Sequence, residues 1–143
     1  PRSTLFPYTT LFRSTHDMET GLKIAKKIFE LKPDEPEPVE RVAAFCIECS
    51  LAENTGMVLD YLEENFPPTK YRIMLRARYH FLLKNYSQSI KVIREALAMD
   101  DDGDSLATMM LYNLLGQVYR DMGSIENALK YYGYNMRLDL SAI

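Results

Sequence analysis

One stretch near the C-terminus alternates large and small residues at helical spacing, and it constrains the fold more than any other feature. Residues three or four positions apart lie on one face of a helix, so the stretch predicts two amphipathic helices that meet at Gly123. Gly116 and Ala128 are small where the two backbones are expected to approach most closely. Such a helix pair buries its apolar face by stacking on similar pairs. The residues of the motif are Leu115, Gly116, Tyr119, Gly123, Ala128 and Tyr132.

Helical periodicity extends along most of the chain and predicts an all-α fold of seven helices. Prolines at 33, 36, 67 and 68 punctuate the connections between the early helices. The predicted helices cover residues 18–31, 38–52, 55–65, 69–83, 87–99, 105–122 and 124–138.

The motif recurs upstream, which indicates an internal repeat. In the last copy the aligned residues are Gly116, Tyr119, Met122, Ile125, Ala128, Tyr132 and Asn135. The copy before it has Ala77, His80, Leu83, Tyr86, Ser89, Ile93 and Ala96. A weaker copy has Cys46, Cys49, Ala52, Thr55, Val58, Leu62 and Asn65. The copies lie 31 and 39 residues apart, on either side of a period of about 34 residues.

This motif resembles the consensus of the tetratricopeptide repeat family, with Tyr112 standing where that consensus often has Trp. Residues 18–34 resemble the second half of a repeat, through Gly21, Ala25, Ile28 and Pro33. The resemblance implies a right-handed superhelical α-solenoid. We expect one repeat domain over residues 15–143, divided into a half repeat at 18–34 and repeats at 37–66, 69–100 and 105–140.

The first residues are set apart from this domain. Residues 4–14 resemble the translated text of a sequencing-library adapter, so residues 1–14 are treated as an artefactual segment. The half repeat that follows them and the lack of a polar capping helix at the other end predict an array truncated at both ends, a fragment of metagenomic type.

Charge and composition narrow the function classes. Without Arg2 and Arg13 the chain has 15 basic and 20 acidic residues, which argues against nucleic acid or an anionic membrane as partner. No run approaches the ~20 apolar residues of a membrane span. Two cysteines form no disulfide framework, so we expect a soluble cytoplasmic protein.

The residues that usually carry chemistry favour structural roles, and we predict no catalytic residue, metal or cofactor. Cys46 and Cys49 form a C-x-x-C pair that is predicted mid-helix, without the other ligands that zinc needs. His80 has no nucleophile or orienting carboxylate in its pattern, which favours packing between helices. Residues 100–104 lack the alternating carboxylates of a calcium loop and indicate a solvated linker.

Two further clusters have a structural interpretation beside a functional one. Lys70, Arg72, Arg76 and Arg78 could contact nucleic acid, but a solvated helix face fits the acidic total better. Tyrosines 131, 132 and 134 could form a stacking platform, but their helical spacing favours packing against a further repeat.

The resemblance places a ligand groove on the first helix of each pair. The candidate peptide-groove residues of the third and fourth copies are Tyr71, Met74, Arg78, Phe81, Met110, Asn113, Gln117 and Arg120. In the second copy the corresponding residues are Ala43, Ile47 and Ser50. Asn113 and Gln117 can bond an extended peptide backbone, and Arg78 and Arg120 can pair with carboxylates.

These observations favour a protein- or peptide-binding scaffold or adaptor without catalysis of its own, with an extended and acidic partner segment. Self-association through exposed end helices is a second kind of contact that the pattern allows. The alternative is the repeat arm of a larger enzyme, because residues 115–123 are also similar to repeats in front of transferases that add N-acetylglucosamine to protein Ser or Thr.

Overall fold

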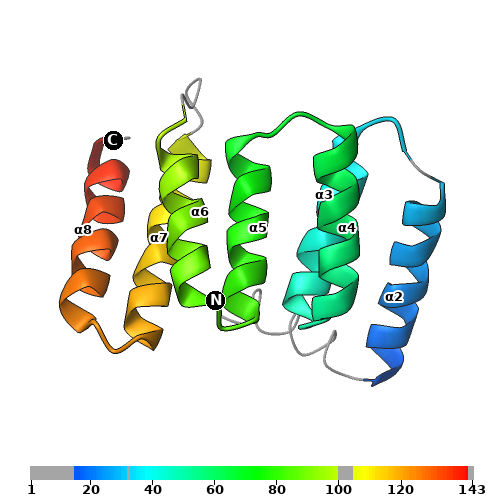
Figure 1. The fold of residues 1–143 in the computed structure, drawn as a ribbon, viewed down its shortest axis with the longest axis horizontal. Helices are drawn as coiled ribbons and strands as arrows, with labels where there is room; N and C mark the ends of the chain where they lie inside the picture. The colour runs from blue at the N-terminus through cyan, green and yellow to red at the C-terminus, as the bar shows by residue number, and fades with distance from the viewer. Residues whose placement is uncertain (1–14, 32, 100–104, 142–143) are drawn as a thin grey trace. The chain divides into compact units, whose positions relative to one another are not determined.

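In a computed structural model of the chain, the described part comprises residues 15–31, 33–99 and 105–141. These residues form seven helices and no strand, so the predicted all-α class is confirmed. The chain divides into two compact units at Pro67 and Pro68. The first unit contains α2 (Thr15–Glu30), α3 (Pro36–Glu48) and α4 (Ala52–Asn65). The second contains α5 (Lys70–Leu82), α6 (Tyr86–Leu97), α7 (Ser105–Asp121) and α8 (Ile125–Ser141) (Figure 1).

The same turn joins α3 to α4, α5 to α6, and α7 to α8. Each turn has one residue with a positive φ, namely Ser50 at 57°, Lys84 at 60° and Gly123 at 87°. The N–H of the following residue donates to a carbonyl five residues upstream, at Cys46, His80 and Tyr119 respectively. The N–H of each positive-φ residue also donates to a carbonyl three residues upstream, which completes a Schellman motif. Three identical turns make each helix pair one structural repeat.

The turns correct the alignment of the second copy. They place Cys46 with His80 and Tyr119, whereas the sequence pattern had matched Cys49 to those two residues. The corrected spacing from the second copy to the third is 34 residues, from Leu51 to Asn85, instead of 31. A shift of three residues keeps nearly the same helix face, since a turn has 3.6 residues, and periodicity alone therefore missed it.

Small residues lie at the contact inside every pair. In the corrected alignment Ala43, Ala77 and Gly116 are equivalent, and all three are buried. Ala43 was predicted as a groove residue, but it is 0 % exposed and belongs to the helix contact. In the second unit the hydroxyl of Ser89 on α6 donates to the carbonyl of Ala77 on α5 at 2.9 Å. Close backbone approach therefore defines the geometry of each pair.

The first unit packs α2 and α4 around α3. The buried side chains come from all three helices and include Ala25, Val39, Val42, Leu59 and Leu62. The ring of Phe45 lies where a Cβ at Gly21 would be, so the glycine lets α2 approach α3. Phe29 on α2 and Tyr61 on α4 meet edge to face, with ring centroids 5.0 Å apart. Ile24 on α2 is 57 % exposed.

Four tyrosines of the second unit pack on one another between α7 and α8. Tyr131 is stacked on Tyr119 with 5.6 Å between centroids, and Tyr134 meets Tyr112 edge to face at 5.3 Å. Tyr132 instead covers Gly116. The tyrosines of α8 thus pack on α7 of their own pair, which corrects the prediction that they await a further repeat.

An arginine from α6 extends this aromatic cluster. The Arg94 guanidinium donates a hydrogen bond to the Tyr119 hydroxyl at 3.0 Å. This hydrogen bond raises the pKa of Arg94 above its ordinary value. Arg94, Tyr119 and Tyr131, which we call the aromatic ladder, therefore link α6, α7 and α8.

Gly116 and Gly133 provide a matched test of the helix contact. A Cβ at Gly116 would lie 2.5 Å from the Tyr132 ring, whereas a Cβ at Gly133 would have no neighbour within 4 Å. We expect Gly116→Ala to lower the free energy of unfolding by about 1–3 kcal/mol relative to Gly133→Ala, because the ring must move. Gly133→Ala itself should be stabilising by about 0.5–1 kcal/mol, the ordinary difference between Ala and Gly in a helix interior.

Urea denaturation of the two variants and the parent chain measures both changes. Equal stabilisation by the two substitutions would show that Tyr132 yields freely and that Gly116 does not set the helix contact.

Candidate peptide-binding groove

The eight candidate groove residues of the second unit lie on α5 and α7, and these two helices pack against each other. On α5 they are Tyr71, Met74, Arg78 and Phe81, and on α7 they are Met110, Asn113, Gln117 and Arg120. The spacing of three, seven and ten residues is the same in both sets, so each set follows one face of its helix. The eight residues therefore lie on two helices in contact, and their role in binding stays a prediction.

The side chains of the two sets differ in exposure. Asn113 is exposed, and Gln117, one turn further along α7, is half-buried. Arg120 is exposed, with 58 % of its side chain accessible. Met74 is only 1 % exposed, which leaves it in the core and not on the surface where the sequence placed it. The polar members on α7 are thus more accessible than the apolar members on α5.

The arginines of the candidate set differ in their surroundings. Arg120 lies near the carboxylate of Asp121, with Nε and Oδ1 3.9 Å apart, at the outer limit of an ion pair. Such an exposed contact contributes little to stability, so the guanidinium remains available to a ligand carboxylate. Arg78 is half-buried on α5. Phe81, half-buried on the next turn of α5, has its ring centroid 6.0 Å from that of Tyr86 on α6.

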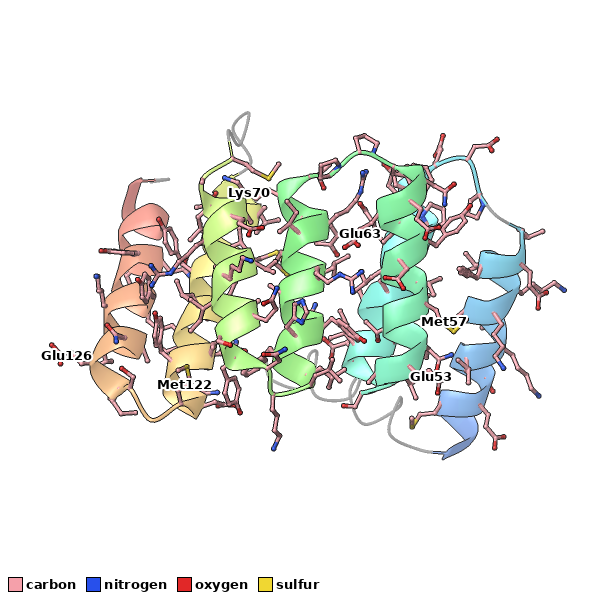
Figure 2. The ribbon with its side chains drawn as sticks, in the orientation of Figure 1. Glu53, Met57, Glu63, Lys70, Met122 and Glu126 are labelled. Carbon is pink, nitrogen blue, oxygen red and sulfur yellow. The ribbon has the colours of Figure 1, made fainter. Side chains whose placement is uncertain are left out.

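The basic cluster on α5 is partly buried. Lys70 is 6 % exposed, and its ammonium donates to the Thr108 hydroxyl on α7 at 3.1 Å (Figure 2). Arg76 lies over the Tyr79 ring at 5.4 Å, while Arg72 and Arg78 are half-buried. Thr69 caps the start of the helix by accepting a hydrogen bond from the Arg72 N–H at 3.1 Å. These contacts give Lys70, Arg72 and Arg76 structural roles within the second unit.

The other candidates for chemistry occupy structural positions. Cys46 is buried in the last turn of α3 and Cys49 is its C-cap, so the C-x-x-C pair lies at a helix end and not mid-helix. His80 is half-buried, with its ring 5.8 Å from that of Tyr79. No group of three or more His, Cys, Asp or Glu side chains suited to a metal occurs among the described residues. The predicted linker at 100–104 and the segment 1–14 lie outside the described residues.

Comparison with protein families identifies the α7–α8 pair. Residues 111–133 match the model of the tetratricopeptide repeat family. The chain carries a tetratricopeptide repeat. The matched segment runs from α7 into α8 and includes Gly116, the turn at Gly123 and Tyr132. No match was found among curated proteins or among solved structures.

The tetratricopeptide repeat is generally a protein-interaction module. The α5–α6 pair has the same turn hydrogen bonds as the matched pair. In the described residues no helix is long and apolar enough to cross a membrane.

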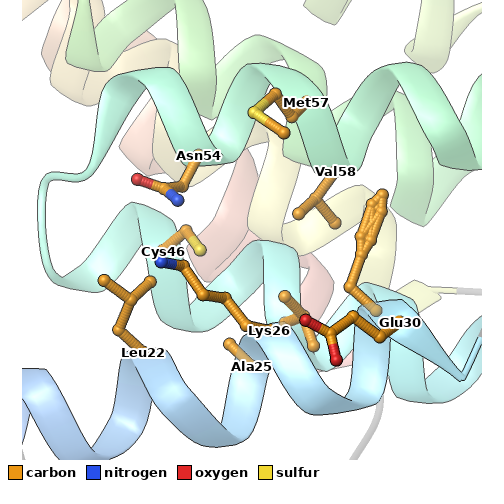
Figure 3. Close-up of a pocket in the computed structure, with 10 residues that line it drawn as sticks. Leu22, Ala25, Lys26, Glu30, Cys46, Asn54, Met57 and Val58 are labelled. Atoms are coloured by element: carbon orange, nitrogen blue, oxygen red, sulfur yellow. The ribbon is translucent and has the colours of Figure 1, made fainter.

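The first unit contains a cleft that the sequence did not reveal. It has a volume of about 400 Å³ and lies among α2, α3 and α4 (Figure 3). Met57 is 60 % exposed and points from α4 toward α2 (Figure 2). The residues around the cleft are Leu22, Ala25, Lys26, Phe29, Glu30, Val42, Cys46, Asn54, Met57 and Val58. A correct alignment of the repeats could have predicted this cleft, because it shows small residues where another repeat has tyrosines. The three-residue shift of the second copy concealed that difference.

The thiol at the floor of this cleft gives a test of the packing. Burial, together with the nearby Cys49, raises the pKa of Cys46 from 9.0 to about 11. At pH 8 the thiolate fraction of Cys46 should therefore be about 100-fold below that of a free thiol, and alkylation by iodoacetamide correspondingly slower. Mass spectrometry after timed alkylation measures the rate at each cysteine.

In guanidinium chloride the two cysteines should react alike, which provides the control.

The raised pKa of Cys46 stabilises the fold fully below about pH 9, and this contribution is lost as the pH rises through about 11. Rapid alkylation of Cys46 in the folded chain at pH 8 would contradict its burial.

Proposed function

We propose that the protein is a scaffold or adaptor that binds an extended segment of a partner protein along α5 and α7 and performs no catalysis itself. The observation that carries the proposal is the repeat at residues 111–133, whose first helix presents Asn113, Gln117 and Arg120 on one face. Their exposure ranges from half-buried to exposed, so a bound chain can reach all three.

The chemistry of this face favours an acidic, extended ligand. Asn113 and Gln117 each offer a donor and an acceptor one helical turn apart, which suits the alternating groups of an extended backbone. Arg78 and Arg120 offer guanidinium groups that pair well with carboxylates. Tyr71, Phe81 and Met110 are half-buried and supply apolar contact beside these polar groups.

The proposal places the protein in the cytoplasm, where free thiols such as those of Cys46 and Cys49 persist. Contact between copies is part of the proposal as well, because Ile24 on α2 and Leu129 on α8 are large apolar side chains that are more than half exposed.

Charge reversal tests the binding face. We expect the double substitution Arg78→Glu and Arg120→Glu to weaken binding to arrayed acidic peptides by at least about tenfold, since each lost charge-assisted hydrogen bond contributes about 1.5–3 kcal/mol. Fluorescence anisotropy on the best-bound array peptides gives the dissociation constants.

The matched control is Lys91→Glu with Lys130→Glu, which makes the same change in net charge on exposed positions of α6 and α8. This control should keep the parent affinity at moderate salt. An equal loss of peptide affinity in the two double variants would show that binding depends only on net charge. Unchanged affinity of the Arg78 and Arg120 variant would show that these residues are not part of the site.

The alternative from the sequence, a repeat arm of a glycosyltransferase, uses the same helical face. The peptide experiment therefore applies to both functions, and sequencing of the gene distinguishes them by whether it encodes a transferase domain.

A further inference from the structure

The cleft of the first unit and the aromatic ladder of the second unit occupy equivalent places in the repeat. The resemblance of residues 18–34 to the second half of a repeat aligns Gly21 with Ser89, and this match places Lys26 on α2 at the position of Arg94 on α6. By the corrected alignment of the turns, Cys46 corresponds to Tyr119. Val58 on α4 corresponds to Tyr131 on α8, since Thr55 corresponds to Ala128. All three residues of the first unit line the cleft.

The exchange of residues accounts for the cleft. In the second unit the rings of Tyr119 on α7 and Tyr131 on α8 are stacked, with centroids 5.6 Å apart and an interplanar angle of 6°. In the first unit a cysteine and a valine replace these two rings, and about 400 Å³ is open. This volume is within the range of about 300–1,000 Å³ that is typical of ligand pockets.

The cationic group is retained although the rings are not. Arg94 donates to the Tyr119 hydroxyl at 3.0 Å, and Lys26 holds the equivalent position beside the open cleft. In Figure 3 the Lys26 side chain points away from Glu30 and along the cleft toward Leu22. A phenol that enters the cleft would therefore meet an ammonium donor where the internal tyrosine meets a guanidinium.

We propose that this cleft binds a tyrosine side chain of a partner protein, with the ring in the cleft that Cys46 and Val58 line and the hydroxyl accepting a hydrogen bond from Lys26. The second unit supplies the precedent, because there the chain's own Tyr119 ring makes the equivalent contacts. Leu22, Ala25 and Val42 provide the apolar wall, and the Cys46 thiol at the floor is 1 % exposed.

This second site consists of other residues than the binding face on α5 and α7, and its assignment to a protein ligand rests on the proposed scaffold function. The two sites can be tested separately, because the cleft is formed by residues of the first unit and the binding face by residues of the second.

The probes are p-cresol, which is the tyrosine side chain alone, and N-acetyl-tyrosinamide, with toluene and N-acetyl-phenylalaninamide as analogues that lack the hydroxyl. We expect both phenols to shift the methyl resonances of Met57 and Val58 in the full chain. Each analogue without the hydroxyl should bind about tenfold more weakly, since it lacks the charge-assisted hydrogen bond to Lys26.

Two variants locate the ligand. Cys46, and not Cys49, is the residue equivalent to Tyr119. The substitution Cys46→Tyr therefore restores the ring that the second unit has, and it should abolish phenol binding. Lys26→Met is on an exposed position and should weaken p-cresol about tenfold while leaving toluene unchanged. Arg94→Met, at the equivalent place of the second unit, is the matched control and should leave p-cresol binding unchanged.

Several results would overturn the proposal. These are an absence of cleft shifts with p-cresol, equal affinity for toluene and p-cresol, or binding of p-cresol without N-acetyl-tyrosinamide. Phenol binding that survives Arg78→Glu with Arg120→Glu supports the cleft even where the acidic peptides fail to bind, so the two failures are distinguishable.

Discussion

The close approach of two helices at one small residue is the constraint on which each repeat depends. Ala43, Ala77 and Gly116 are buried at this contact, and none has a side chain larger than a methyl group. The Schellman turn that follows reverses the chain within three residues and satisfies the last carbonyls of the first helix. Contact and turn together set which residues of the second helix face the first. The positions of the tyrosine rings and of the cleft follow from that geometry.

The residues around this contact are free to vary, and their variation differentiates the repeats. In the second unit tyrosines from α7 and α8 stack over the contact, and Arg94 joins them from α6. In the first unit smaller side chains hold the same places and leave a cleft. A repeat fold can therefore acquire a pocket while it keeps the same turn and the same small residue at the helix contact, because the side chains around that contact can change.

The sequence predicted the helices well because their signals are local. Periodicity, prolines and the glycine at 123 located all seven helices, with bounds that differ from the observed ones by a few residues. The repeat family followed from the α7–α8 pair, where the glycine and tyrosine positions are best preserved. The second copy was misaligned because Cys46 and Cys49 are both small and lie nearly one turn apart, so either one satisfied the pattern. Only the hydrogen bonds of the turn distinguish them.

The binding residues were harder to predict than the fold, since burial depends on packing between helices that are distant in sequence. Met74 lies at helical spacing from Arg78 and Phe81 and was expected on the same face of α5, yet it is 1 % exposed while they are half-buried. The cleft is formed by residues of three helices. In the sequence it is indicated only by two differences between repeats, and these differences are visible only in the correct alignment. Once Cys46 and Val58 are aligned with Tyr119 and Tyr131, the loss of two rings beside a retained cation identifies the site. An internal repeat thus supplies its own reference structure, in which the filled copy indicates the chemistry that fits the open one.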